Sequence, residues 1–207
     1  MLLNLLQIIS IIILIVLFTF SYIGFGIFFS NIIFNNRTRL NLGQLGLLGV
    51  FFLIILSYLT SLFVPHDSFH NILFLVIGGL IFFDNRTRVK KFEIKIILYI
   101  ILFTLVFFFI AKNHDDFQYY HLPFSLSLSE NKISFGMGLL NYGYRHHSSI
   151  LFLNSLTLLP WIKYYLFNLP NYLIFIFVNF ILLNEVIKNI KKKKYNILNI
   201  NFFFYFN

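Results

Sequence analysis

Two adjacent carboxylates, Asp115 and Asp116, stand at the end of a long uncharged stretch of the chain. They lie in the stretch 112–123, which directly follows sixteen residues without a charge, in a chain that has only 7 acidic residues among 207. Paired carboxylates beside a membrane surface are suited to general acid–base chemistry, because one of them can accept a proton from a hydroxyl group. The pair therefore predicts a catalytic base. A structural interpretation stays open, in which one of the two caps a short helix over 117–130.

A second polar motif, FGMGLLNYGYRHHSS over 135–149, combines glycines with Arg145, His146 and His147. A guanidinium beside imidazoles and hydroxyls suits a phosphate or pyrophosphate, because each of these groups donates hydrogen bonds to phosphate oxygens. The motif therefore predicts a phosphate-binding segment. The spacing is equally compatible with an interfacial loop, in which Arg145 extends its charged end to the membrane surface.

Metal binding is a third chemistry that these residues allow. Imidazole and carboxylate ligands for a divalent cation such as Mg or Mn could come from His114, Asp115, Asp116, His121, His146 and His147. The HExxH motif of zinc proteases does not occur in the chain, and His66 and His70, which have the i, i+4 spacing, lack the glutamate. We take His114 and Asp115 as candidate ligands and leave the cofactor open.

The composition is that of a multi-pass membrane protein. Hydrophobic residues make up 59% of the chain and charged residues 11%, against about 25% charged residues in soluble domains. The absence of cysteine excludes disulfides, thiolate metal sites and cysteine nucleophiles. Basic residues of membrane proteins collect on the cytoplasmic side, and this explains the net charge of +9. We therefore expect the lipid bilayer, and no nucleic acid, as a partner.

Long uncharged runs predict the helices that position these residues. A run of about 20 apolar residues is long enough to cross a bilayer as a helix. The sequence contains four runs near or above this length, over 3–33, 40–64, 94–111 and 169–187, and a shorter one over 68–83, which local thinning of the bilayer can accommodate. They predict an all-α fold, a polytopic transmembrane bundle with a periplasmic loop that carries short juxtamembrane helices. Its parts are four helices in 1–111, the polar loop 112–168, and a helix, a basic segment and the start of a further helix in 169–207.

Basic residues orient these helices in the membrane. Segments 35–40, 84–95 and 185–195 hold twelve of the 16 basic residues, so we expect them on the cytoplasmic side. The loop 112–168 then faces the periplasm. If 148–166 crossed the membrane, the four lysines KKKK after the last span would lie outside. We therefore expect 148–166 to lie along the outer interface or to dip into it, and a sixth span is the alternative.

Three elements of the loop form a pattern: D-x-x-x-Y-H-L-P from Asp116, G-x-x-N from Gly138 and R-x-x-x-S from Arg145. This pattern resembles that of a group of mostly uncharacterised bacterial multi-pass membrane proteins that look like GT-C-type glycosyltransferases. The resemblance covers about 112–160. It implies an inner-membrane protein of cell-envelope glycan synthesis, with a polyprenyl-phosphate-linked sugar as the donor substrate.

The resemblance also implies a role for each residue of the loop. Asp116 would be the catalytic carboxylate that deprotonates the acceptor hydroxyl, and Asp115 an accessory base or a metal ligand. The donor phosphate would be held by Arg145, His146, His147 and His121. Members of the GT-C class have more spanning helices than this chain. We therefore expect the chain to be an N-terminal fragment, which can be incomplete and inactive.

A non-catalytic polytopic membrane protein, engaged in transport or in assembly, is the alternative function. Ion-coupled carriers place ionisable groups within their spans, near the middle of the bilayer. The predicted spans are almost free of charge, which argues against such a carrier and leaves an assembly partner open. A metal-dependent membrane hydrolase is a third hypothesis, and it requires a cation bound at His114 and His121.

Overall fold

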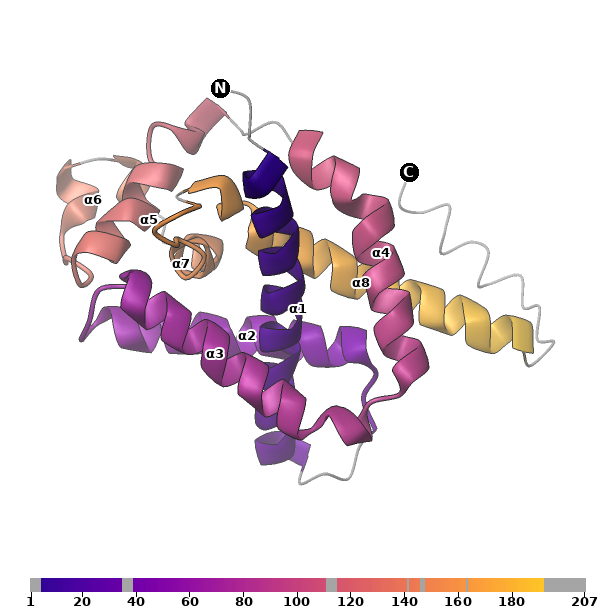
Figure 1. Ribbon diagram of the computed structural model, residues 1–207. Coiled ribbons are helices and arrows are strands. Elements are labelled where there is room, and N and C mark those ends of the chain that lie inside the picture. The colour runs from indigo at the N-terminus through magenta and orange to yellow at the C-terminus, as the bar shows by residue number, and fades with distance from the viewer. Residues whose placement is uncertain are drawn as a thin grey trace.

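The computed structural model describes residues 5–34, 39–110, 115–140, 142–145, 148–162 and 164–191. Within these ranges the regular structure is helical (Figure 1). The longer helices are α1 (Leu5–Phe34), α2 (Leu42–Ser61), α3 (Ser68–Asp84), α4 (Lys91–Ile110) and α8 (Leu169–Lys191). The shorter helices and 3-10 turns are η1 (Arg86–Arg88), η2 (Asp115–Phe117), α5 (His121–Glu130), α6 (Met137–Leu140), η3 (Tyr142–Arg145), α7 (Ser149–Ser155) and η4 (Tyr164–Leu166).

Among the described residues, four segments are long and apolar enough to cross a membrane: α1, α2, α4 and Tyr164–Ile190, which includes all of α8 but its last residue. The prediction of an all-α, multi-pass membrane fold is therefore confirmed. The predicted span 68–83 corresponds to α3, a shorter apolar helix of 17 residues. At 1.5 Å per residue α3 is about 26 Å long, which is less than a hydrocarbon core of about 30 Å.

Helices α2 and α3 begin at polar residues that satisfy free backbone N–H groups. The Asn41 side chain accepts from the Gln44 N–H at 2.9 Å, and the Gln44 side chain accepts from the Asn41 N–H at 3.0 Å. The Asp67 carboxylate accepts from the His70 N–H at 2.8 Å. Such a cap stabilises a helix start by about 1 kcal/mol. The caps therefore fix the residues at which the chain enters α2 and α3.

Helix α1 lies at the centre of the bundle and packs on α2 and α3 (Figure 1). Both crossings occur at glycines. Gly49 of α2 lies against the α1 backbone at Tyr22, and Gly26 of α1 lies against the α2 backbone, so closely that a Cβ on either glycine would overlap a backbone carbonyl. Gly24 meets Gly78 of α3 in the same way. Lipid is as apolar as the helices, so close contact between small residues is what holds such helices together.

Helix α4 is fastened to α8 by hydrogen bonds within an apolar interface. The Thr104 hydroxyl donates to the Ile100 carbonyl at 2.7 Å. The Tyr172 hydroxyl of α8 donates to the Ile101 carbonyl at 3.0 Å and lies 2.9 Å from Thr104 Oγ1. The opposite face of α4 is exposed, with Phe103 at 81%. The contacts of Tyr172 thus hold α4 to α8, while the opposite, apolar face of α4 is suited to contact lipid.

The described residues between α4 and α8 fold into a cap, which gathers α5, α6 and α7 at one end of the bundle (Figure 1). The short helices predicted for this loop are therefore present. The cap has an apolar core of its own, formed by Phe124, Leu128, Leu151, Phe152 and Phe167. Tyr58 of α2 stacks on Phe152 with ring centroids 3.9 Å apart, so the cap core continues into the bundle.

Candidate functional site

The two predicted carboxylates lie on η2, at the start of the cap. Asp115 is exposed and Asp116 is half-buried. The Tyr120 hydroxyl donates to Asp116 Oδ2 at 3.4 Å. Partial burial of the phenol, and secondly the charge of Asp116, raise the pKa of Tyr120. The phenol therefore stays protonated near neutral pH and serves as a hydrogen-bond donor to the carboxylate.

The capping interpretation of Asp115 and Asp116 is wrong. The helix that follows, α5, begins at His121 and not at 117. Its N-cap residue is Tyr120, whose side chain makes no capping hydrogen bond. Asp116 instead accepts the N–H groups of Tyr119 and Tyr120 through its own backbone carbonyl, at 3.2 and 3.1 Å. These bonds close the turn that precedes α5.

Arg145 ends η3, and its guanidinium is held from two sides. Arg145 Nε donates to the Gly138 carbonyl at 3.2 Å, and the guanidinium carbon lies 4.0 Å from the centroid of the Tyr142 ring. A cation above an aromatic face is attracted by the ring electrons. These contacts use Nε and the flat face of the group, so the terminal nitrogens can bind an anion. His146 and His147, predicted to assist Arg145, lie outside the described residues.

Tyr120 connects the turn that carries Asp116 with the turn that carries Arg145. Its hydroxyl contacts Asp116, and its ring lies against Gly143 of η3, where an added Cβ would come within 2.9 Å of the ring. Only a glycine leaves room for the ring at this position. The His121 ring meets the Tyr120 ring edge-on at 4.3 Å. The structure therefore gathers three predicted elements, Asp116, His121 and the arginine turn, around one tyrosine.

Both turns are anchored on the cap core by aromatic residues next to the predicted site residues. Phe117 of η2 meets Phe167 edge-on, with ring centroids 5.0 Å apart. Tyr144 of η3 lies 5.7 Å from Phe124 by the same measure. Phe124 and Phe167 belong to one apolar core. The folding of this core therefore sets the position of the carboxylate relative to the guanidinium.

The metal site predicted at His114 and Asp115 stays a prediction. His114 lies outside the described residues. In the part of the chain that the structure describes, no group of three histidine, cysteine, aspartate or glutamate side chains could hold a metal ion. Asp115 and His121 do not complete such a group with other described residues, so Mg or Mn would need a ligand from elsewhere.

A buried polar junction joins the cap to the bundle, and one of its residues is His66 of the i, i+4 histidine pair. His66 precedes α3, Asn71 lies in its first turn and Ser155 ends α7, and all three are fully buried. His66 Nδ1 lies 2.6 Å from Ser155 Oγ, and His66 Nε2 lies 3.0 Å from Thr60 Oγ1. The Asn71 amide nitrogen contacts the carbonyls of His66, Ser155 and Leu158 at 3.0, 2.8 and 2.9 Å. Buried polar groups need hydrogen-bond partners. The polar residues His66, Asn71 and Ser155 within apolar surroundings were therefore the signal in the sequence that could have indicated this junction.

The junction contains a hydroxyl–imidazole pair of the kind found in nucleophilic sites. Ser155 Oγ donates to the Phe152 carbonyl at 2.7 Å and also lies 2.6 Å from His66 Nδ1. Both side chains are fully buried, away from solvent. Burial, and secondly the neighbouring His70, lower the pKa of His66 to about 4. His66 is thus neutral at pH 7, and we assign the junction a structural role.

Residues 151–159 are buried inside the protein, where the sequence predicts an interfacial segment over 148–166. Helix α7 has 7 residues, far fewer than the roughly 20 that a span requires. The polar residues that follow it bond within the protein, since the Thr157 hydroxyl lies 2.7 Å from the Asn154 carbonyl and 3.0 Å from the Leu166 carbonyl. Trp161 is 81% exposed and is the residue of this segment best placed for a membrane interface.

Comparison of the chain with protein-family models finds no match, and neither the curated proteins nor the solved structures contain one. The function is therefore inferred from the arrangement of the side chains. That arrangement is a half-buried carboxylate and an anchored guanidinium, held by one apolar core in the cap of a multi-pass membrane protein.

Proposed function

We propose that the chain is a glycosyltransferase-like membrane protein, which transfers a sugar from a lipid-phosphate donor to an acceptor at the surface of the cap. The observation that carries this proposal is the contact of Tyr120 with both Asp116 and Gly143, the latter two residues before Arg145. A base and a cation that binds phosphate are the two groups that such a transfer requires. At the end of a membrane bundle, a lipid headgroup and a water-borne acceptor can meet.

The proposed reaction exchanges one bond for another at the anomeric carbon of the sugar. The acceptor hydroxyl gives its proton to the Asp116 carboxylate, and its oxygen bonds to the anomeric carbon. The bond from that carbon to the phosphate oxygen breaks, and the lipid phosphate leaves with the bonding electrons. The Arg145 guanidinium stabilises the negative charge that the phosphate gains, because it is already oriented by Tyr142 and Gly138. Asp115 is the accessory base in this scheme.

The proposal places the cap on the periplasmic side of a bacterial inner membrane, since most basic residues lie in the segments predicted to be cytoplasmic. Cysteine labelling tests this, because the chain has no cysteine. Asn131→Cys puts an exposed thiol in the cap, and Thr87→Cys puts one after α3. We expect a membrane-impermeant maleimide to label the first variant in intact spheroplasts and the second only after lysis. The reverse pattern would place the cap in the cytoplasm and would exclude a periplasmic transferase.

Replacing Asp116 by Asn is expected to lower sugar transfer at least about 100-fold, because an amide cannot accept the proton of the acceptor. The measurement is the release of polyprenyl phosphate from a panel of polyprenyl-phosphate hexoses, with the full-length protein in membranes. The matched control is Glu130→Gln, which removes an exposed carboxylate at the end of α5 in the same cap. We expect this control to transfer sugar at the wild-type rate.

Two results would count against the proposal. Transfer that persists in Asp116→Asn, at normal expression, would remove this carboxylate from the mechanism. The second result is that the wild-type protein consumes none of the donors and binds them no more tightly than Asp116→Asn does. This result would favour the alternative of a non-catalytic protein of transport or assembly.

A further inference from the structure

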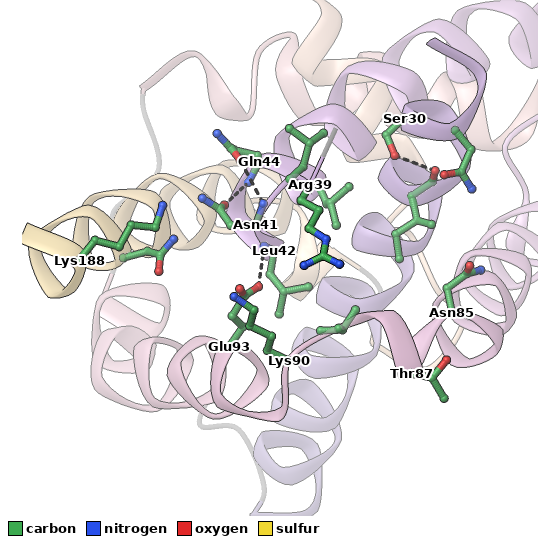
Figure 2. A pocket seen from close by; sticks show the side chains of 16 residues that line it. Ser30, Arg39, Asn41, Leu42, Gln44, Asn85, Thr87, Lys90, Glu93 and Lys188 are labelled. Carbon is green, nitrogen blue, oxygen red and sulfur yellow. Dashed lines mark hydrogen bonds between the residues drawn. The ribbon is translucent and has the colours of Figure 1, made fainter. Parts of the chain in front are cut away.

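A polar cavity of about 730 Å³ opens at the end of the bundle where α2 and α4 begin and α8 ends (Figure 2). Its walls come from the end of α1, the first turn of α2, the segment around η1, the start of α4 and the last turns of α8. The volume lies within the range of ligand pockets, roughly 300–1,000 Å³. None of the residues assigned to the proposed transferase site lines this cavity, so it raises a separate question.

Basic side chains dominate the charge of this cavity. Arg39 lines it from the segment before α2, Lys90 from the residue before α4 and Lys188 from α8, and Glu93 is the acidic residue among its lining residues. Figure 2 shows Arg39 and Glu93 extending into the same space. The Glu93 carboxylate accepts the N–H of Leu42 at 3.3 Å, so it already occupies the positive start of α2. The cavity thus carries more positive than negative charge.

The three cations differ in how far they are neutralised. Lys188 pairs with Glu185, with the ammonium nitrogen 2.6 Å from the carboxylate oxygen. Arg39 and Lys90 have no acidic partner within salt-bridge distance among the described residues. Both are exposed at the cavity. Two uncompensated cations that face one space, one of them a planar guanidinium, are the arrangement that binds phosphate oxygens.

The position of the cavity at the ends of the helices indicates which phosphates can reach it. The cavity lies where apolar helices end, as the residues Asn31, Asn41, Asn85 and Asn184 in its wall show. Ile27, Leu40 and Leu45 also line it and give it an apolar side. Polar helix ends with an apolar side are found at the level of lipid headgroups, where basic pockets between helices bind anionic phospholipids.

We propose that this cavity binds a phosphate group through Arg39 and Lys90, the phosphate being that of an anionic phospholipid headgroup or free phosphate. The site lies at the opposite end of the bundle from the cap and does not depend on the proposed sugar transfer. Its occupation would stabilise the contacts between the starts of α2 and α4 and the end of α8, which all line the cavity.

Native mass spectrometry of the full chain in detergent tests the proposal, with phosphatidylglycerol as the anionic probe and phosphatidylcholine as the zwitterionic one. The test variant is Arg39→Gln/Lys90→Gln. The matched control is Lys91→Gln/Lys95→Gln, which removes two exposed cations from the same start of α4, outside the cavity. We expect the test variant to bind phosphatidylglycerol at least about tenfold more weakly, and the control to stay within about threefold of wild type.

Equal losses in the two double variants would show that diffuse surface charge attracts the lipid, and the cavity proposal would fail. It would also fail if the test variant bound phosphatidylglycerol as wild type does. Arg39→Lys/Lys90→Arg keeps both charges and should bind within about threefold of wild type. Loss of binding in this variant, with helical content and melting unchanged, would likewise overturn the proposal.

The two sources of phosphate are separated by a second arm. Inorganic phosphate is added to the wild type and to the Arg39→Gln/Lys90→Gln variant without lipid, and thermal unfolding is recorded. A rise in melting temperature that is confined to wild type would assign the site to free phosphate. Binding of phosphatidylglycerol without such a rise would assign it to a headgroup. Absence of both effects would overturn the proposal.

Discussion

Replacing Asn71 by Asp should lower the free energy of unfolding by at least about 3 kcal/mol, the cost of leaving two or more buried polar groups unsatisfied. The Asn71 amide nitrogen contacts three backbone carbonyls at 2.8, 2.9 and 3.0 Å. An aspartate has nearly the same shape but would present a carboxylate oxygen to those carbonyl oxygens. Because Asn71 is fully buried, water could neither solvate the carbonyls nor screen the repulsion.

Thermal unfolding in detergent, followed by circular dichroism, measures this effect, and limited proteolysis shows whether the cap is released first. The control is Asn131→Asp, the same change at an exposed asparagine after α5. It should stay within about 0.5 kcal/mol of wild type. If Asn71→Asp melts together with the control, the contacts of Asn71 with Ser155 and Leu158 do not hold the cap to the bundle, and the structural role of the junction is refuted.

Replacing Gly49 by Ala should destabilise the bundle by about 2 kcal/mol or more, although alanine is the better helix former. Alanine gains about 1 kcal/mol in helix propensity. Its methyl group, however, would overlap the backbone carbonyl of Tyr22 on α1. A backbone atom cannot rotate away as a side chain can, so α1 and α2 must separate, and overpacking of this kind costs about 1–3 kcal/mol or more.

Gly79→Ala is the matched control for this prediction. A Cβ at Gly79 of α3 would meet nothing within 4 Å. The same substitution should therefore leave stability unchanged there or raise it by up to about 1 kcal/mol. Unfolding by titration with sodium dodecyl sulfate gives both values. Shifts of the same sign in the two variants would mean that helix propensity, and not the contact between α1 and α2, determines the response.

The membrane class and the approximate helices were predictable because they depend on local composition. The run 40–64 contains α2, and the run 94–111 differs from α4 by a few residues at its start. The crossings of α1 were not predictable. Gly26 and Gly49 are weak helix formers in isolation, and their value depends on which backbone lies opposite, which a single sequence does not state.

The candidate site was predictable in its residue types but not in its connections. The carboxylates and Arg145 drew attention as rare charges in an apolar chain. The link between them, the ring of Tyr120 against Gly143, depends on how the cap folds. The junction was hidden for a similar reason. His66 and Ser155 are 89 residues apart in the chain, so no local pattern pairs them.

The hydroxyl of Tyr172 fixes how α4 is aligned along α8. It donates to the Ile101 carbonyl at 3.0 Å and lies 2.9 Å from Thr104 Oγ1, and both partners belong to α4. A slip of α4 along α8 by one helical turn would displace these partners by about 5.4 Å and break both contacts. Because Tyr172 is buried, water could not replace the lost partners. One side chain of α8 therefore resists the sliding of two helices whose contact is otherwise apolar.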